Sequence, residues 1–201
     1  MSFDLIGVPY SSMAKPRRIA NAIHVLREVG LAEHFAATDQ VRDMGDLERF
    51  EGSGVRGTSG LLNERALGHL VTATREAVLR SLDRGRRPLL VGGDCPVLLG
   101  ALAAGRARHG AAGLLLVDGH EDAWPPRLSP TLGVLSTEDF PAADYTQPGG
   151  LTWEELLEIA RPPLAASDCL GCSIVIYNPD LDPKRKSAAR IVRFASDLVS
   201  A

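Results

Sequence analysis

Short aliphatic runs alternate along the chain with longer stretches in which apolar residues recur every three or four positions. The aliphatic runs have the length of buried strands and lead into turn-favouring residues; they cover residues 4–8, 88–91, 113–118 and 173–177, with a weaker candidate at 41–43. The periodic stretches predict amphipathic helices over residues 19–29, 63–84, 96–109, 152–165 and 187–199. This alternation predicts an α/β fold in three α/β/α layers, with a mostly parallel central sheet.

The clearest helix start in the sequence lies at Thr152. In Thr152-Trp153-Glu154-Glu155 the threonine and the last glutamate have the spacing of a capping box. Before it, residues 119–151 form a 33-residue stretch with several prolines and no helical pattern. So long a stretch in a compact domain indicates a functional loop, a disordered loop or a missing part of the fold.

The composition is that of a globular protein. Of the 201 residues, 45% are hydrophobic and 23% are charged, which suits one domain spanning residues 1–201. The formal net charge of −3 provides no general attraction to nucleic acid or to an anionic membrane, so neither is expected as a partner. No apolar run approaches the roughly 20 residues that span a bilayer, and the N-terminus lacks the pattern of a secretory signal. Together with an odd number of cysteines, three, these features predict a cytoplasmic protein.

A D-x-H-x-D motif stands directly after an aliphatic run, and it is formed by Asp118, His120 and Asp122. In an extended chain alternate side chains point the same way, so these three can converge on one point at the end of a strand. Two carboxylates and an imidazole are ligands that suit Mn²⁺, Fe²⁺ or Zn²⁺. The motif therefore favours a metal site over the alternative, a solvated polar strand end.

A second strand, residues 88–91, turns through Gly92 and Gly93 into a helix that begins near Cys95. Glycines permit positive φ and a close approach of the backbone, and a helix N-terminus favours an anion, a substrate or a reactive thiol. Cys95 is therefore a candidate ligand or reactive group. Two alternatives stay open: a purely structural turn, and a nucleotide site, which would need an acidic residue at the end of a second strand.

Together these motifs resemble the ureohydrolase family of arginase, agmatinase and formimidoylglutamase. Gly92-Gly93-Asp94-Cys95 is similar to the family's G-G-D-H, and Asp118-Gly119-His120-Glu121-Asp122 is similar to its D-A-H-x-D. Other similar strings follow in the family's order: LIGVPY at 5–10, RDMGDL at 42–47, GGLT at 149–152 and IVIYNP at 174–179. The resemblance implies a single arginase-like domain and a two-manganese centre bridged by Asp118.

Three departures from the family pattern affect the expected site. Cys95 stands where the family has a histidine, and a thiolate favours softer ions such as Zn²⁺. Thr131 and Gly133 stand where the family has two more aspartate ligands, and Ile176 replaces the glutamate that binds the guanidinium group. The resemblance therefore implies one or two Mn²⁺ ions, with Zn²⁺ or Fe²⁺ as substitutes, held by Asp118, His120, Asp122 and Cys95.

The chain is also short for the family. Asp122 and Thr131 are nine positions apart, although in the family helices and strands separate the corresponding motifs. An internal deletion near residues 123–136, with strands missing at one edge of the sheet, accounts for this spacing. An exposed sheet edge invites association, so a homo-oligomer is a candidate assembly.

The function implied by the resemblance is metal-dependent hydrolysis of non-peptide C–N bonds in a small guanidino or amidino substrate. A metal-bound hydroxide would attack the guanidino or amidino carbon. The alternative is a catalytically impaired or truncated arginase-like paralogue that can bind one metal ion, and the changes at Thr131, Gly133 and Ile176 motivate it. Metal content distinguishes the two hypotheses, because a tight two-ion stoichiometry would contradict the alternative.

Overall fold

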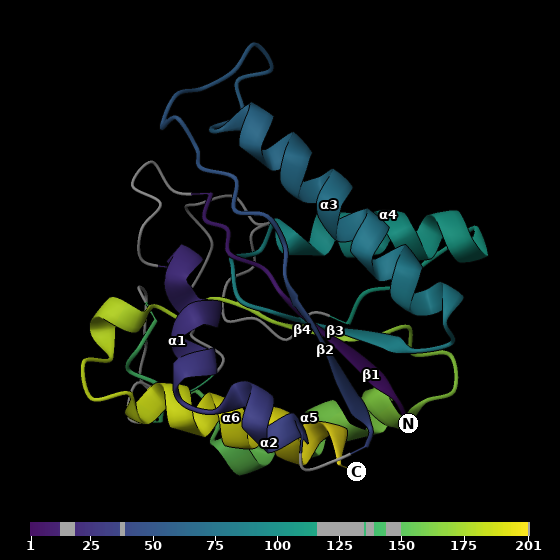
Figure 1. The fold of residues 1–201 in the computed structure, drawn as a ribbon, viewed down its shortest axis with the longest axis vertical. Coiled ribbons are helices and arrows are strands. Elements are labelled where there is room, and N and C mark those ends of the chain that lie inside the picture. The colour runs from purple at the N-terminus through teal and green to yellow at the C-terminus, as the bar shows by residue number, and fades with distance from the viewer. Residues whose placement is uncertain (13–18, 37–38, 116–134, 136–138, 144–149, 201) are drawn as a thin grey trace.

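The computed structural model describes residues 1–12, 19–36, 39–115, 135, 139–143 and 150–200. In these residues parallel strands form one sheet in the order β2-β1-β3-β4 (Figure 1). The strands are β1 (Phe3–Gly7), β2 (Val41–Asp46), β3 (Arg87–Val91) and β4 (Cys172–Ile174). Every strand pair is parallel, so the predicted α/β class with a parallel sheet is confirmed.

Helices cover both faces of this sheet. The helices are α1 (Ala22–Glu28), α2 (Leu31–Ala36), α3 (Glu64–Asp83), α4 (Val97–His109), α5 (Trp153–Ala165) and α6 (Lys186–Val199). Figure 1 shows α3 and α4 on one face and the other helices on the opposite face, which gives the predicted three layers. None of the helices in the described ranges combines the length and the apolar character needed to cross a membrane.

Two hydrophobic cores lie on the two faces of the sheet. Alternate strand residues point to opposite faces, so Phe3 and Leu5 of β1 pack with Leu89 of β3 against the layer of α1, α2 and α6. Ile6 and Leu90 point the other way and pack against α3 and α4. These strand side chains are at most 3% exposed, so the aliphatic runs in the sequence are buried on both faces.

The strand predicted over residues 173–177 is β4, which ends at Ile174, and the structure differs from the sequence-based prediction more strongly at two other elements. Helix α2 was not predicted, although Leu31 and Phe35 form a buried i, i+4 apolar pair on it. The strand predicted over residues 113–118 is wrong for residues 113–115, where the chain is irregular and Leu115 is 65% exposed. A strand requires a hydrogen-bonded neighbour, and no described segment pairs with these residues. Residues 116–118 lie outside the described part of the chain.

The edge strand β2 is tied to α1 by Arg27. The Arg27 guanidinium donates to Asp43 Oδ1 at 3.0 Å through Nη2 and to Asp46 Oδ1 at 2.9 Å through Nε. Partial burial disfavours the Asp43 carboxylate, but hydrogen bonds from Arg27 and from the Gly45 amide outweigh it, so the pKa of Asp43 lies below its ordinary value. The contact holds β2 in place at the end of the sheet.

Because of this ion pair, we expect part of the free energy of unfolding to be lost at acidic pH. The pKa of Asp43 is lower in the folded than in the unfolded chain, so its contribution is fully present above the unfolded value of about 3.9. It is lost as the pH falls through the folded value. We expect the difference in free energy of unfolding between wild type and Asp43→Asn to shrink as the pH falls from about 5 to about 3, in urea denaturation.

The matched control is Asp39→Asn, which removes an exposed carboxylate in the turn before β2. Its stability difference from the wild type should change little over the same pH range. A difference for Asp43→Asn that stays constant on acidification would contradict a role of the Arg27 contact.

Candidate functional site

The carboxyl ends of β1, β3 and β4 lie side by side, and we call this end of the sheet its carboxyl edge. The Val8 amide donates to the Val91 carbonyl at 2.9 Å, and the Gly92 amide donates to the Ile174 carbonyl at 2.9 Å. These bonds continue the sheet pattern past the strand ends and bring together the loops that follow them. In parallel α/β sheets this edge is where ligands bind.

The turn after β3 has the backbone that the two glycines predicted. Gly92 and Gly93 have φ values of +99° and +73°, in the left-handed region that favours glycine. A Cβ on Gly93 would lie 2.9 Å from Val97 Cγ2 and 3.2 Å from the Val8 carbonyl oxygen. Close packing of β1 and α4 around the turn therefore leaves no room for a side chain at this position.

Asp94 is buried directly after this turn, with 5% of its surface exposed. Its Oδ2 accepts hydrogen bonds from the Ser12 amide at 2.6 Å and from the Ser12 hydroxyl at 2.7 Å. Its Oδ1 is buried and has no hydrogen-bond partner among the described residues. Burial raises the pKa of Asp94 above its ordinary value, although the bonds from Ser12 oppose this.

Tyr10 adds a second buried polar group to the same edge. The side chain is 2% exposed, and its hydroxyl oxygen has no hydrogen-bond partner within the described ranges. Burial, together with the nearby Asp94 carboxylate, raises the pKa of Tyr10 to about 12. The phenol is therefore protonated at neutral pH.

Cys95 is the one predicted metal ligand that the structure places. Its side chain is half-buried at the start of α4, where the Leu98 amide donates to the Cys95 carbonyl at 3.0 Å. The three cysteines, all within the described ranges, form no disulfide. The other predicted ligands, Asp118, His120 and Asp122, lie outside the described residues.

The donors at this edge are compatible with a divalent metal. A thiolate binds divalent metals, and the buried Asp94 carboxylate, next to Cys95 in the sequence, favours a cation nearby. No group of three or more His, Cys, Asp or Glu side chains within the described part of the chain could hold a metal ion by itself. A metal site at this edge would therefore need ligands from outside the described ranges.

Ile176, at the position where the family resemblance expects a glutamate, has an unusual backbone conformation. Its φ of +68° is in the left-handed region, which is strained for a β-branched residue. Its amide donates to the Gly93 carbonyl at 2.9 Å and so connects the loop after β4 to the turn after β3. The apolar side chain provides no charge for a cationic substrate.

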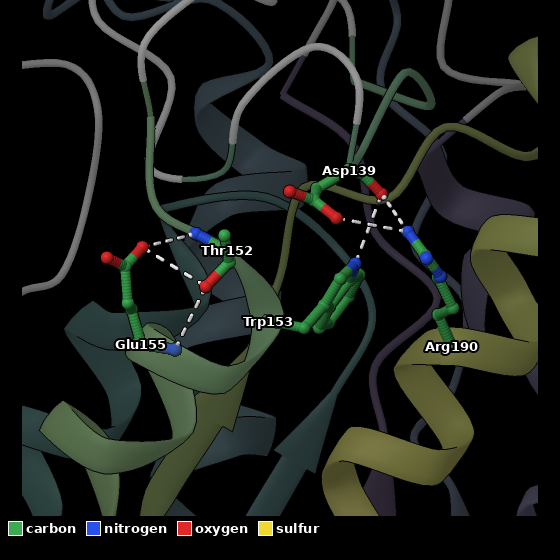
Figure 2. A network of polar contacts seen from close by, with 5 residues as sticks. All are labelled: Asp139, Thr152, Trp153, Glu155 and Arg190. Carbon is green, nitrogen blue, oxygen red and sulfur yellow. Dashed lines mark hydrogen bonds and ion pairs between the residues drawn. The ribbon is translucent and has the colours of Figure 1, made fainter.

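Residues 139–143 are anchored beside the end of β4. Figure 2 shows the Asp139 carbonyl accepting hydrogen bonds from Trp153 Nε1 and from Arg190 Nη1, each at 3.1 Å. The Phe140 and Trp153 rings meet edge to face, with centroids 5.8 Å apart. The Ala142 carbonyl accepts a hydrogen bond from the backbone amide of Asn178 at 2.9 Å. Helices α5 and α6 therefore hold this segment next to the loop that follows β4.

The capping box predicted at the start of α5 is confirmed. The Thr152 hydroxyl accepts from the Glu155 amide at 3.2 Å, and the Glu155 carboxylate accepts from the Thr152 amide at 2.8 Å (Figure 2). This reciprocal pair satisfies backbone donors that a helix start otherwise leaves open. It sets the start of α5, whose first residue is Trp153.

Sequence reasoning missed the polar residues that surround Asp94. Ser12 is 82 positions away from Asp94, and Asn63, whose Nδ2 donates to the Ser12 carbonyl at 3.1 Å, is 51 positions from Ser12. Neither residue stands in a recognisable motif. Asn63 has a φ of +55° and lies directly before α3, although the periodic pattern predicted it as the first residue of that helix.

The chain is similar in sequence to arginases. A family model described as "Arginase family" matches residues 2–134 and 128–200. The arginase of Bacillus caldovelox is 28% identical over 131 residues, which cover 64% of this chain and 44% of that protein. Arginase-1 of Xenopus laevis is 28% identical over 130 residues, which cover 64% of this chain and 41% of that protein. The matched region thus spans less than half the length of these relatives.

Solved structures share the fold. The structure of the arginase from Bacillus caldovelox superposes with a TM-score of 0.82 at 19% identity, covering 100% of this chain and 98% of the other. A formiminoglutamase from Trypanosoma cruzi, described as determined with Mn²⁺, has a TM-score of 0.73 at 16% identity and covers 98% of this chain and 91% of the other. At such identities the structural likeness shows the fold alone.

Proposed function

Because the chain belongs to the arginase family, we propose that it is a metal-dependent hydrolase that cleaves non-peptide C–N bonds in small guanidino or amidino compounds. The observation that carries the proposal is the turn after β3, which places Cys95 directly after the buried Asp94 at the carboxyl edge of the sheet. The residues of this turn resemble the family's G-G-D-H segment. The D-x-H-x-D motif follows later in the chain, in the family's order.

Four residues would hold the metal: Asp118, His120, Asp122 and Cys95. A bound divalent ion would lower the pKa of a water molecule bound to it and would polarise the carbon–nitrogen group of the substrate. Cys95 would add a negatively charged thiolate ligand, which favours Zn²⁺ or Fe²⁺ more than a histidine does, although Mn²⁺ is the ion expected from the family. Two further ligands are replaced by Thr131 and Gly133, so one ion is easier to hold than two.

Substrate recognition in this chain must differ from the family pattern. Ile176 carries no charge and cannot bind a guanidinium or amidinium group by ion pairing. The Ile176 backbone instead fixes the turn after β3 through the Gly93 carbonyl. We infer that residues 1–201 act as one domain, shortened near residues 123–136, and that the cationic substrate group is bound by other residues.

The test is metal content combined with product release. Purified protein is stripped of metal and loaded separately with Mn²⁺, Zn²⁺ and, without oxygen, Fe²⁺. Bound metal per chain is measured by plasma mass spectrometry, and urea or formamide is measured with guanidino and formimino substrates. We expect at least one bound ion per chain and product release that depends on it, and we expect Asp118→Asn to lose both.

Two outcomes would overturn parts of this proposal. Protein that binds metal tightly but releases no product from any substrate would contradict the hydrolase and favour a catalytically impaired arginase-like paralogue. Protein that binds none of the three ions above the level of Asp118→Asn would contradict the metal centre itself.

A further inference from the structure

A buried carboxylate joins separate parts of the chain next to Cys95. Asp94 Oδ2 accepts both the amide and the hydroxyl of Ser12, in the loop after β1. The Ser12 carbonyl in turn accepts from Asn63 Nδ2, and Asn63 Oδ1 accepts from the Gly54 amide at 2.7 Å. The side chains of Asp94 and Asn63 thus connect three segments that are distant in the sequence, each through Ser12.

Burial of Asp94 requires a reason that the fold alone does not provide. A buried carboxylate is costly unless its oxygens are hydrogen-bonded or paired with a cation. Asp94 has no Lys or Arg partner within hydrogen-bond distance among the described residues, and its Oδ1 is unpartnered there. The two bonds from Ser12 are the described contacts that offset this cost, so Asp94 and the loop after β1 hold each other in place.

The turn that carries Asp94 is held from the other side as well. The Gly93 carbonyl accepts from the amide of Ile176, whose left-handed φ is strained. Residues 92–95 are therefore clamped between the loop after β1 and the loop after β4. Cys95 is the next residue along the chain from Asp94, so the backbone that carries its thiol is held while both contacts persist.

We propose that the Ser12–Asp94 contact is a positioning lock for Cys95, which fixes the thiol at the carboxyl edge of the sheet. Asp94 acts through the loop and does not itself contact the metal or the substrate. Asn63 extends the lock to the loop that precedes α3. The use of Cys95 as a metal ligand rests on the proposed function, but the lock itself does not.

If the lock exists, variants that weaken it should change the rate at which Cys95 is alkylated in the metal-free protein. Iodoacetamide labelling followed by peptide mass spectrometry gives separate rates for Cys95 and Cys169 in each variant. With Asp94→Ala we expect the Cys95 rate to rise by about tenfold or more, the factor that loss of a hydrogen bond to a charged group implies. Ser12→Ala keeps the amide donor, and we expect a smaller rise of about threefold. The Cys169 rate should stay within about twofold, because it reports general unfolding.

The variant Asp94→Asn distinguishes an effect of loop positioning on the Cys95 rate from an effect of the Asp94 charge on that rate. The asparagine oxygen can accept both Ser12 bonds, whereas the negative charge next to the thiol is gone. A positioning lock predicts a Cys95 rate within about threefold of the wild type for this variant. An effect of charge on the thiol predicts instead that Asp94→Asn and Asp94→Ala accelerate labelling equally. Ser53→Ala, an exposed serine in the loop before α3, is the control and should leave the rate unchanged.

The proposal is overturned if Asp94→Ala leaves the Cys95 rate unchanged, if Asp94→Asn matches Asp94→Ala, or if Cys169 accelerates in parallel with Cys95. A second readout is the affinity for Zn²⁺, which should fall in Asp94→Ala and be restored in Asp94→Asn. If the wild-type protein binds no metal, the proposed function fails while the labelling result still decides on the lock.

Discussion

Replacement of Gly100 by alanine is expected to lower the free energy of unfolding by about 2–3 kcal/mol, because helices α3 and α4 are in contact at this residue. A Cβ on Gly100 would lie 2.6 Å from Thr74 Cβ, 2.8 Å from the Val71 carbonyl oxygen and 3.0 Å from the Arg75 amide nitrogen. Two of these atoms belong to the backbone of α3 and cannot rotate away. The helices, which cross in Figure 1, would have to separate.

Gly68→Ala is the matched control for this prediction. Gly68 lies in α3, and a Cβ there would meet nothing within 4 Å. Alanine has the higher helix propensity, so this variant should gain about 0.5–1 kcal/mol. Urea unfolding followed by circular dichroism measures both changes. Loss of stability in both variants, or in neither, would contradict the packing argument.

Asp182→Ala is expected to lower the free energy of unfolding by about 3 kcal/mol, since it removes the buried acceptor at the start of α6. Asp182 is 5% exposed, and its Oδ1 accepts from the Lys186 amide at 2.9 Å. Its Oδ2 accepts from the Ala188 amide at 2.9 Å and from the Tyr177 hydroxyl at 3.0 Å. Alanine would leave all three donors without this acceptor.

Two companion variants test the assignment of this loss to the cap. Asp168→Ala removes an exposed carboxylate away from α6 and should change the free energy of unfolding by no more than about 0.5 kcal/mol. Tyr177→Phe removes only the hydroxyl donor, so it should cost about 1 kcal/mol in the wild type and less in the Asp182→Ala background. Equal losses for Asp168→Ala and Asp182→Ala would contradict the role of the buried Asp182 carboxylate at the start of α6.

The Asp182 contact also bears on the site, because Tyr177 and Asn178 follow β4. Burial and the Asp182 carboxylate raise the pKa of Tyr177 above its ordinary value, so its hydroxyl remains a donor at neutral pH. The backbone amide of Asn178 donates a hydrogen bond to the Ala142 carbonyl. Helix α6 is therefore connected to the loop after β4 that contains Ile176.

Much of the secondary structure could be predicted because its signals are local. The aliphatic runs became β1 and β3, and the periodic stretch at 63–84 became α3. The spacing of Thr152 and Glu155 identified the start of α5. These features depend on residues within one or two turns of each other, so the linear sequence contains them. The strand expected at residues 113–115 failed because pairing requires a neighbour that the local pattern does not specify.

The sequence by itself determined the alternation of strands and helices, the glycine turn before Cys95 and the order of motifs that marks the arginase family. Only the tertiary structure decided which distant side chains meet. The Ser12–Asp94 bonds and the close packing of Gly100 on Thr74 depend on how β1, α3, β3 and α4 stack. Such contacts arise when the burial of apolar faces fixes the positions of whole elements. For that reason they leave no periodic or motif signal along the chain.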